Sequence, residues 1–128
     1  MHEKTVTLSA GEWQVMEQLW HHHNLTLMEL VRLLAPETGW SKSTIVTMVG
    51  RLEAKGALQY TEGGKARVYS ASITRQQAAL QETESLLGRI YRGSVGMLVS
   101  TLADSRGLTQ DDIEELSAIL EKAREGQS

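Results

Sequence analysis

The stretch TGWSKSTIVTMVGRLEAKGAL, Thr38 to Leu58, predicts a helix whose exposed side carries almost no long side chains. Ser41 is a good N-cap, and Gly56 can adopt the left-handed conformation that often ends a helix. Successive residues of a helix point about 100° apart, which places these apolar residues on one inward-facing side: Ile45, Met48, Val49 and Leu52. The opposite side carries mostly small residues and hydroxyls: Ser43, Val46, Thr47, Gly50 and Ala54, with Thr44, Arg51 and Lys55 along one margin. A helix with such a side can approach another surface closely.

The segments around this helix predict a winged helix-turn-helix domain over residues 1–72. The capping-box pattern SAGE predicts a first helix from about Ala10 to His22. The pattern TLME, which starts at Thr26, begins a second helix that Pro36 is expected to end. Two β-rich runs in ALQYTEGGKARVYSA meet at the pair of glycines, which is typical of a β-hairpin.

The remaining residues, 73–128, predict a helical homodimerisation region. One helix is expected to run from near Thr74 to a break at DSRG, and TQDDIEELSAILEKAR predicts a second. Two helices joined in this way cannot enclose a core alone, so their apolar stripes need a partner, most simply a second copy. The residues expected at this interface are Leu80, Leu87, Ile90, Tyr91, Leu98, Leu102, Ile113, Leu116 and Leu120. The expected fold class is therefore mainly α with a small β-hairpin, a winged helix-turn-helix DNA-binding domain followed by a two-helix dimerisation region.

The composition is that of a globular protein and excludes several classes of function. Of 128 residues, 41% are hydrophobic and 23% charged, and no apolar run is long enough to cross a membrane. The N-terminus lacks an apolar signal-peptide core, so a cytoplasmic location is expected. The absence of cysteine excludes disulfides, thiolate metal sites and cysteine nucleophiles. No catalytic triad, metalloprotease, P-loop or dinucleotide-binding motif occurs, so we expect neither enzymatic activity nor a cofactor or bound metal.

Basic residues concentrate around the predicted helix and hairpin, although the whole chain carries a formal charge of −3. Between Ser41 and Tyr69, five Lys and Arg residues stand against two Glu, which gives this segment a charge of +3. Double-stranded DNA suits such a surface, because its major groove admits a helix and presents base edges to hydroxyl, apolar and basic side chains. We expect these residues near base edges: Ser43, Thr44, Val46 and Thr47. Phosphate contacts are expected from the helix N-terminus at Ser41 and from Lys42, Arg51, Lys55, Lys65 and Arg67.

Two further patterns have alternative interpretations. His21, His22 and His23 point about 100° apart on a helix, so at most two of them could share a metal ion. Cationic side chains are also favoured at a helix C-terminus, which explains the same residues without a metal. Three glycines interrupt the first C-terminal helix: Gly88, Gly93 and Gly96. They could permit close helix contact in a dimer, weaken a segment for a regulatory cut, or mark a kink or break, and the sequence does not decide among these.

Several runs of the sequence resemble the penicillinase-repressor family, the BlaI, MecI and CopY type of transcriptional regulator. These runs are LSAGEWQVMEQLW, GWSKSTIVTMVGRLEAKGAL, the EGG and VY of the hairpin, and GRIYRG followed by DDIEELSAIL. The resemblance extends from about Leu8 to Leu120. It implies homodimers with an N-terminal winged helix on DNA and a C-terminal helical dimerisation part. It also implies repression of β-lactamase, penicillin-binding-protein or copper-homeostasis genes from dyad operators, often with TACA and TGTA half-sites.

The family pattern also assigns roles by position. It places Ser43, Thr44 and Thr47 at base-contacting positions and Arg51 at a backbone-contacting one. The chain departs from the pattern where relatives often have proline, lysine and glutamine: at Lys42, Ser43 and Val46, respectively. Its operator therefore need not share the half-sites of the relatives.

The resemblance suggests two routes of regulation. In the antibiotic branch, a membrane sensor protease triggers cleavage of the repressor, commonly at an Asn-Phe bond, and the matching positions here are Thr101 and Leu102. The copper branch senses metal through a C-terminal cysteine cluster, which this chain lacks. Metal sensing by that route is excluded, whereas repression of a transporter or resistance gene is not.

These observations favour a homodimeric repressor that binds a pseudo-palindromic operator in double-stranded DNA through two recognition helices. The regulated genes are expected to serve β-lactam-type resistance or metal homeostasis. A membrane sensor protease is a further partner to be tested, and this chain itself is not expected to insert into the membrane. One alternative is a helical adaptor that uses the winged helix for protein contacts, which the acidic net charge favours. The other is a ligand-sensing DNA-binding regulator, for which the small C-terminal part offers little room.

Overall fold

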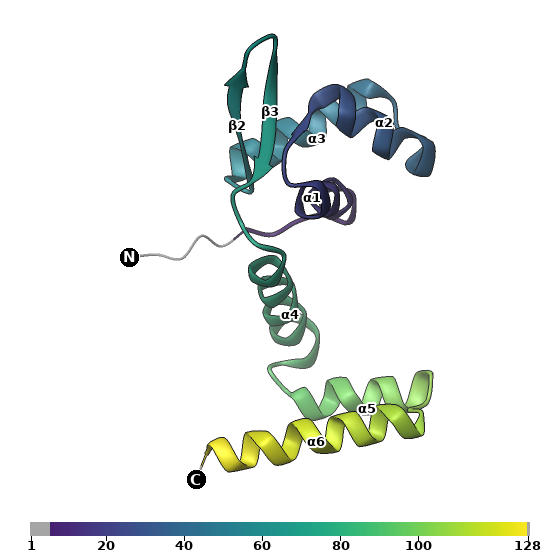
Figure 1. The fold of residues 1–128 in the computed structure, drawn as a ribbon. Helices are drawn as coiled ribbons and strands as arrows, with labels where there is room; N and C mark the ends of the chain where they lie inside the picture. The colour runs from purple at the N-terminus through teal and green to yellow at the C-terminus, as the bar shows by residue number, and fades with distance from the viewer. Residues whose placement is uncertain (1–5, 128) are drawn as a thin grey trace. The chain divides into compact units, whose positions relative to one another are not determined.

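The structure is a computed structural model that describes residues 6–127, and within them it contains six helices and three short strands (Figure 1). Their order is α1 (Ala10–His22), β1 (Leu25–Thr26), α2 (Leu27–Thr38), α3 (Lys42–Lys55), β2 (Leu58–Gly63), β3 (Ala66–Ala71), α4 (Arg75–Tyr91), α5 (Val95–Ser105) and α6 (Gln110–Gly126). The contacts divide the chain into two compact units, one extending to Glu84 and one beginning at Ser85.

The first unit has the helix and strand order of a winged helix, with α1, α2 and α3 followed by the β2–β3 hairpin. The sheet is antiparallel in the order β1-β3-β2, and β1 is a two-residue strand that the sequence patterns did not predict. Gly63 pairs with Ala66, which leaves Gly64 and Lys65 as the hairpin loop. Gly64 has a φ of 86°, a conformation that glycine adopts without strain. The predicted hairpin is therefore confirmed.

The core of this unit lies between the three helices and the inner side of the sheet. The most deeply buried large side chains come from all three helices: Val15, Met16 and Leu19 of α1, Leu30 and Leu34 of α2, and Ile45 and Leu52 of α3. Burying each Leu, Ile, Val or Met side chain contributes about 1.5–3 kcal/mol, so this cluster makes a large favourable contribution to the stability of the unit. The predicted inward side of α3 is confirmed, although Met48 is only half-buried.

Short-range capping fixes where these helices begin. Ser9 and Glu12 form a reciprocal capping box at α1, and Thr26 and Glu29 form another at α2. Ser41 caps α3 by accepting a hydrogen bond from the Thr44 N–H at 3.2 Å. All three starts agree with the expectation from sequence, because N-cap residues and capping boxes are local patterns.

The expectation that Pro36 ends α2 is wrong. The helix continues through Pro36 to Thr38 and ends at Gly39, whose φ of 75° is left-handed. The Gly39 N–H donates to the Ala35 carbonyl at 2.9 Å, and the Thr38 hydroxyl donates to the Leu34 carbonyl at 2.8 Å. These bonds close the last turn, so the loss of one N–H at Pro36 is tolerated close to the helix end.

The expectation of two C-terminal helices is also wrong, since the structure has three. The apolar stripe from Leu80 to Leu102 is divided between α4 and α5 at Arg92 and Gly93, which have φ values of 51° and 84°. Ser94 then caps α5 by accepting from the Met97 N–H at 3.1 Å. Of the three glycines singled out, only Gly93 marks a break, and the other two lie inside helices.

The start of α4 packs with the winged helix rather than with the C-terminal helices. Ala78 is 2% exposed in the core of the first unit, and the Trp20 indole N–H donates to the Ile73 carbonyl at 2.9 Å. The first unit consequently extends to Glu84, beyond the expected domain boundary after residue 72. The division into DNA-binding and dimerisation parts remains a prediction.

Candidate nucleic-acid interface

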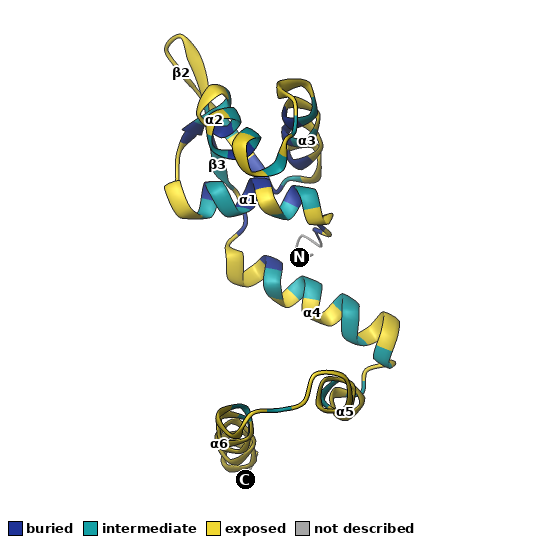
Figure 2. Cartoon of the chain, turned by 90° about the vertical axis from the view of Figure 1, so that its right-hand side faces the viewer, coloured by how far each residue is buried: buried dark blue, intermediate teal, exposed yellow. Residues whose placement is uncertain are grey.

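One side of α3 faces away from the core of the first unit, and Figure 2 shows buried and exposed residues on different sides of this helix. Ile45 and Leu52 are fully buried on the inner side. Ser43, Val46 and Thr47 are exposed on the outer side, and so are Gly50 and Ala54. The outer side therefore consists of hydroxyls, one branched apolar side chain and two residues with almost no side chain.

The hydroxyl groups of this side differ in what they can offer a ligand. The Thr47 hydroxyl donates to the Ser43 carbonyl at 3.0 Å, which leaves its oxygen as an acceptor only. Thr44 shares a hydrogen bond with the Ser41 hydroxyl at 3.1 Å, so both groups are partly committed to the helix cap. The Ser43 hydroxyl has no partner in the part of the chain that the structure describes and can both donate and accept.

Two basic side chains of α3 are exposed at positions suited to phosphate. Lys42 is the first residue of the helix, where the backbone N–H groups also favour an anion. Arg51 lies more than two turns further along and is also exposed. Both agree with the sequence-based expectation of backbone contacts, which stays a prediction.

Lys55, by contrast, is exposed but already paired within the protein. Its Nζ donates to Glu12 Oε1 at 2.5 Å and to the Thr7 carbonyl at 2.8 Å. Glu12 is 3% exposed, and although burial raises the pKa of its carboxyl, hydrogen bonds from Lys55 and Ser9 outweigh burial and hold that pKa below its ordinary value. This geometry does not favour the expected phosphate contact of Lys55, because the ammonium already neutralises a buried carboxylate.

Glu12 was not singled out from the sequence as a partner of α3. The SAGE motif identified it only as a capping residue, and it lies 43 positions from Lys55. No local pattern connects residues at that separation. The ion pair also ties the N-terminal segment to α3, because the same ammonium holds the Thr7 carbonyl.

The β2–β3 hairpin projects away from the helices in both views (Figures 1 and 2). Lys65 is exposed in its loop. The Arg67 guanidinium lies over the Tyr60 ring, 4.1 Å from the centroid, and its Nε is 3.6 Å from Glu62 Oε1. Arg67 therefore contacts Tyr60 and Glu62 on the hairpin itself, and Glu62 offsets part of its charge. Tyr60 was missed in the sequence because its contact depends on strand register.

The histidines at the end of α1 do not form a metal site with neighbouring residues. All three are exposed, and the rings of His21 and His22 contact edge to face, with centroids 4.7 Å apart. Among residues 6–127, no group of three His, Cys, Asp or Glu side chains is arranged to hold a metal ion. In the same range, no helix is both long and apolar enough to cross a membrane.

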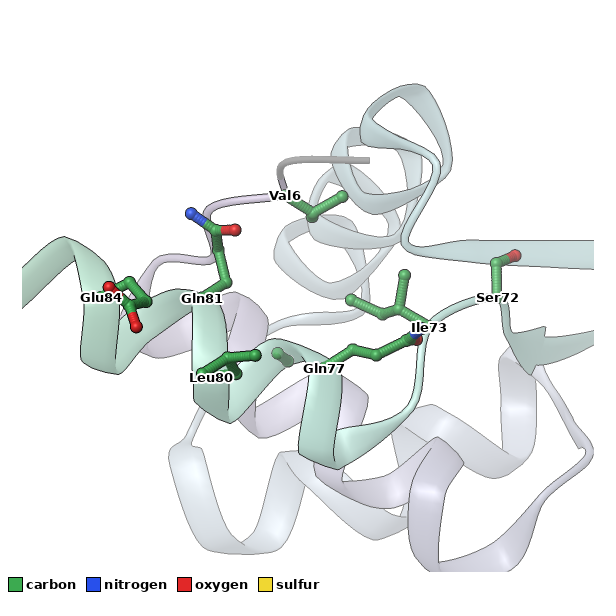
Figure 3. Close-up of a pocket in the computed structure, with 8 residues that line it drawn as sticks. Val6, Ser72, Ile73, Gln77, Leu80, Gln81 and Glu84 are labelled. Carbon is green, nitrogen blue, oxygen red and sulfur yellow. The ribbon is translucent and has the colours of Figure 1, made fainter. Parts of the chain in front are cut away.

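A cavity of about 410 Å³ lies within the first unit, between the N-terminal segment and the start of α4 (Figure 3). Its lining is mixed: Val6, Ile73, Ala78 and Leu80 are apolar, and Ser72, Gln77, Gln81 and Glu84 are polar. Its volume falls in the range of small-molecule sites. The cavity is where the ligand-sensing alternative could be tested, since it adjoins the start of the C-terminal helices.

The second unit exposes most of its apolar side chains, and none of the residues of α5 or α6 is buried. Of the expected interface residues, five are exposed to between 39% and 65%, although the first of them belongs to the first unit: Leu80, Ile90, Leu102, Ile113 and Leu120. The others are half-buried: Leu87, Tyr91, Leu98 and Leu116. Val95, Met97 and Ile119 are exposed in the same way, but they were not among the interface residues predicted from the sequence. Thr101 and Leu102, the positions that match the family's cleavage bond, lie exposed within α5.

Comparisons with known proteins agree with this architecture. The family model described as Penicillinase repressor matches residues 8–122. The penicillinase repressor of Bacillus licheniformis is 32% identical over 120 residues, which cover 94% of each protein. The methicillin resistance regulatory protein MecI of Staphylococcus aureus (strain N315) is 28% identical over 122 residues, which cover 95% of this chain and 99% of that protein.

A solved structure is similar in the region of the winged helix. The solution structure of monomeric Bacillus licheniformis BlaI in complex with the blaP half-operator matches with a TM-score of 0.53 and 33% identity. The match covers 59% of this chain and 92% of that chain. Since the family model spans most of the sequence and the winged-helix order is present, the chain belongs to the penicillinase repressor family, a family of transcriptional repressors rather than enzymes.

Proposed function

We propose that this protein is a DNA-binding repressor that acts as a homodimer and places α3 of each copy in the major groove. The main observation behind this proposal is the outer side of α3, which has hydroxyl groups at Ser43 and Thr47 and almost no long side chains. A helix with this surface can approach base edges closely, and the groove reads such groups. The similar BlaI structure was solved in complex with a half-operator, which supports the same use of the winged helix here.

The phosphate contacts in this proposal come from the ends of α3 and from the hairpin. Lys42 and the N-terminus of α3 meet one strand of the duplex, while Arg51 meets the backbone further along. Lys65 and Arg67 reach the flanking backbone from the hairpin. These contacts position the protein without distinguishing sequences.

Dimerisation through the second unit is proposed because its apolar side chains lack a core of their own. A second copy offers the same surface, so a two-fold interface buries both at once. Two recognition helices related in this way prefer a pseudo-palindrome with half-sites about one helical turn, or a multiple of it, apart.

For the regulated genes, we propose the β-lactam branch, because the curated relatives named above are a penicillinase repressor and a methicillin resistance regulator. As part of the same β-lactam-type regulation, we propose that a protease cleaves the bond between Thr101 and Leu102. Both residues lie in α5, so a protease would require local unfolding of that helix before it could bind an extended segment.

The test is selection of bound fragments from a random duplex library, followed by band shifts at several salt concentrations. Enrichment of a dyad sequence whose affinity falls with salt supports the repressor. Failure to enrich any duplex at low salt would contradict it and favour the protein-binding adaptor.

A further inference from the structure

Gly50 lies in the middle of α3, at a position where the fold does not require glycine. A Cβ at this position would meet no heavy atom within 4 Å, and the backbone is not left-handed. Gly11 differs, because a Cβ there would come within 2.8 Å of Met48 Cε. An exposed glycine inside a helix destabilises the helix relative to alanine. The described fold therefore does not require glycine at position 50, and the absence of a side chain there leaves open space on the exposed side of α3.

Val46 lies one turn before Gly50 on the same exposed side. Its side chain is apolar and branched, and the residue is 44% exposed, beside the exposed Ser43 and Thr47 and one turn after the exposed Lys42. Helix side chains lean toward the N-terminus, so a side chain at position 50 would extend over the turn that contains Val46. Its absence leaves a small space beside the methyl groups of Val46.

Among the base edges of the major groove, the C5-methyl of thymine is the one apolar group. Val46 offers this methyl an apolar contact, and a hydroxyl or amino group in the same place would be desolvated against valine without a partner. We propose that Val46 and Gly50 form a contact site for a thymine methyl, so that each operator half-site contains a thymine facing this position. The inference rests on the proposed function, in which α3 enters the major groove.

The experiment uses the full-length protein and a duplex obtained from the random library. Each thymine of the selected duplex is replaced in turn by deoxyuridine, which removes the methyl and keeps base pairing. The wild-type protein should lose about fourfold in affinity at one thymine of each half-site, the scale set by burying one methyl-sized group. Replacing that thymine in both half-sites of a dimer should lose roughly 15-fold.

Variants at the two positions identify the side chain that reads the methyl. Val46→Ala should bind the thymine and deoxyuridine duplexes almost equally, because the apolar contact is gone. Gly50→Ala should bind the thymine duplex more weakly than wild type but lose less on replacement by deoxyuridine, because the added methyl fills the space. Gly126→Ala is the matched control, since a Cβ there also meets no heavy atom within 4 Å and the residue lies at the end of α6.

The outcomes separate the inference from the function on which it rests. Enrichment of a duplex, with no thymine sensitive to replacement, would overturn the thymine contact and leave the repressor intact. A Val46→Ala protein that retains the full wild-type loss at the same thymine would overturn it as well. If no duplex is enriched, the proposed function fails and the inference fails with it.

Discussion

Replacing Lys55 by methionine removes the cation that neutralises Glu12 while keeping much of the apolar stem. Glu12 is 3% exposed, so its carboxylate would stay largely out of water without a nearby ammonium. Breaking a fully buried pair costs about 3–5 kcal/mol, but the Lys55 side chain is 39% exposed and solvent reduces the loss. We expect the free energy of unfolding to fall by about 2 kcal/mol at neutral pH, within the range for hydrogen bonds to charged groups.

This loss should depend on pH, because it arises from the charge on Glu12. Burial raises the pKa of Glu12, but Lys55 and Ser9 outweigh burial and hold that pKa below its ordinary value of 4.5. A lowered pKa adds stability that is fully present above 4.5 and disappears as the pH falls through the pKa of the folded protein. The variant lacks the contribution of Lys55, so the difference between the two proteins should shrink as the pH falls below 4.5.

Urea unfolding followed by tryptophan fluorescence measures this difference. Trp13, Trp20 and Trp40 all lie in the first compact unit, so the signal reports on the unit that contains the ion pair. Lys42→Met is the matched control: the same substitution at the exposed first residue of the same helix, expected to change stability by no more than about 0.5 kcal/mol. The reasoning is refuted if Lys55→Met loses no more than this control, or if its loss is the same in acid as at neutral pH.

Three further predictions concern other parts of the chain. Leu116→Asp places a charge in the proposed interface and should halve the mass measured by light scattering after gel filtration; an unchanged mass would remove α6 from the interface. Arg51→Ala should weaken binding to different duplexes about equally and reduce the slope of log affinity against log salt by about 1, whereas an unchanged slope would exclude a phosphate contact. Ser94→Ala deletes the cap that accepts the Met97 N–H and should cost about 1 kcal/mol in thermal unfolding followed by circular dichroism. A melting curve identical to that of the wild type would show that α5 does not depend on this cap.

The parts of the fold predicted from the sequence are those with local signals. The bounds of α3 follow from Ser41 and Gly56, and its inner side follows from helical spacing. A break between α4 and α5 was one of the alternatives left open for the three glycines, and it was not predicted because the apolar stripe continues on both sides of it. The local signal is RGS, where Gly93 takes a left-handed φ and Ser94 caps the next helix.

For the candidate site, the sequence predicted which residues of α3 are exposed but not which hydrogen bonds and ion pairs they make. Exposure of Ser43, Val46 and Thr47 follows from the burial of the other side of the helix. Which hydroxyl is left free to donate, and which lysine is already neutralised, depends on contacts between distant segments. Lys55 shows this most clearly, because its partner is in α1 and its second contact is the Thr7 carbonyl.

The pairing of Lys55 with Glu12 also bears on the proposed homodimer, because it leaves fewer free cations in each copy. In the described residues of α3 and the hairpin, Lys42, Arg51 and Lys65 make no ion pair, and Arg67 is partly neutralised by Glu62. At a slope of about −0.9 per phosphate contact, three such cations give about −2.7 for one copy and about −5.4 for two. In the proposed homodimer, the second copy supplies half of these contacts. If the protein binds as that dimer, its operator complex should show a salt slope of about −5.4, and a monomeric Leu116→Asp variant should show a slope of about −2.7 on the same duplex. Equal slopes would mean that the second copy adds no phosphate contacts, which two recognition helices on one dyad do not allow.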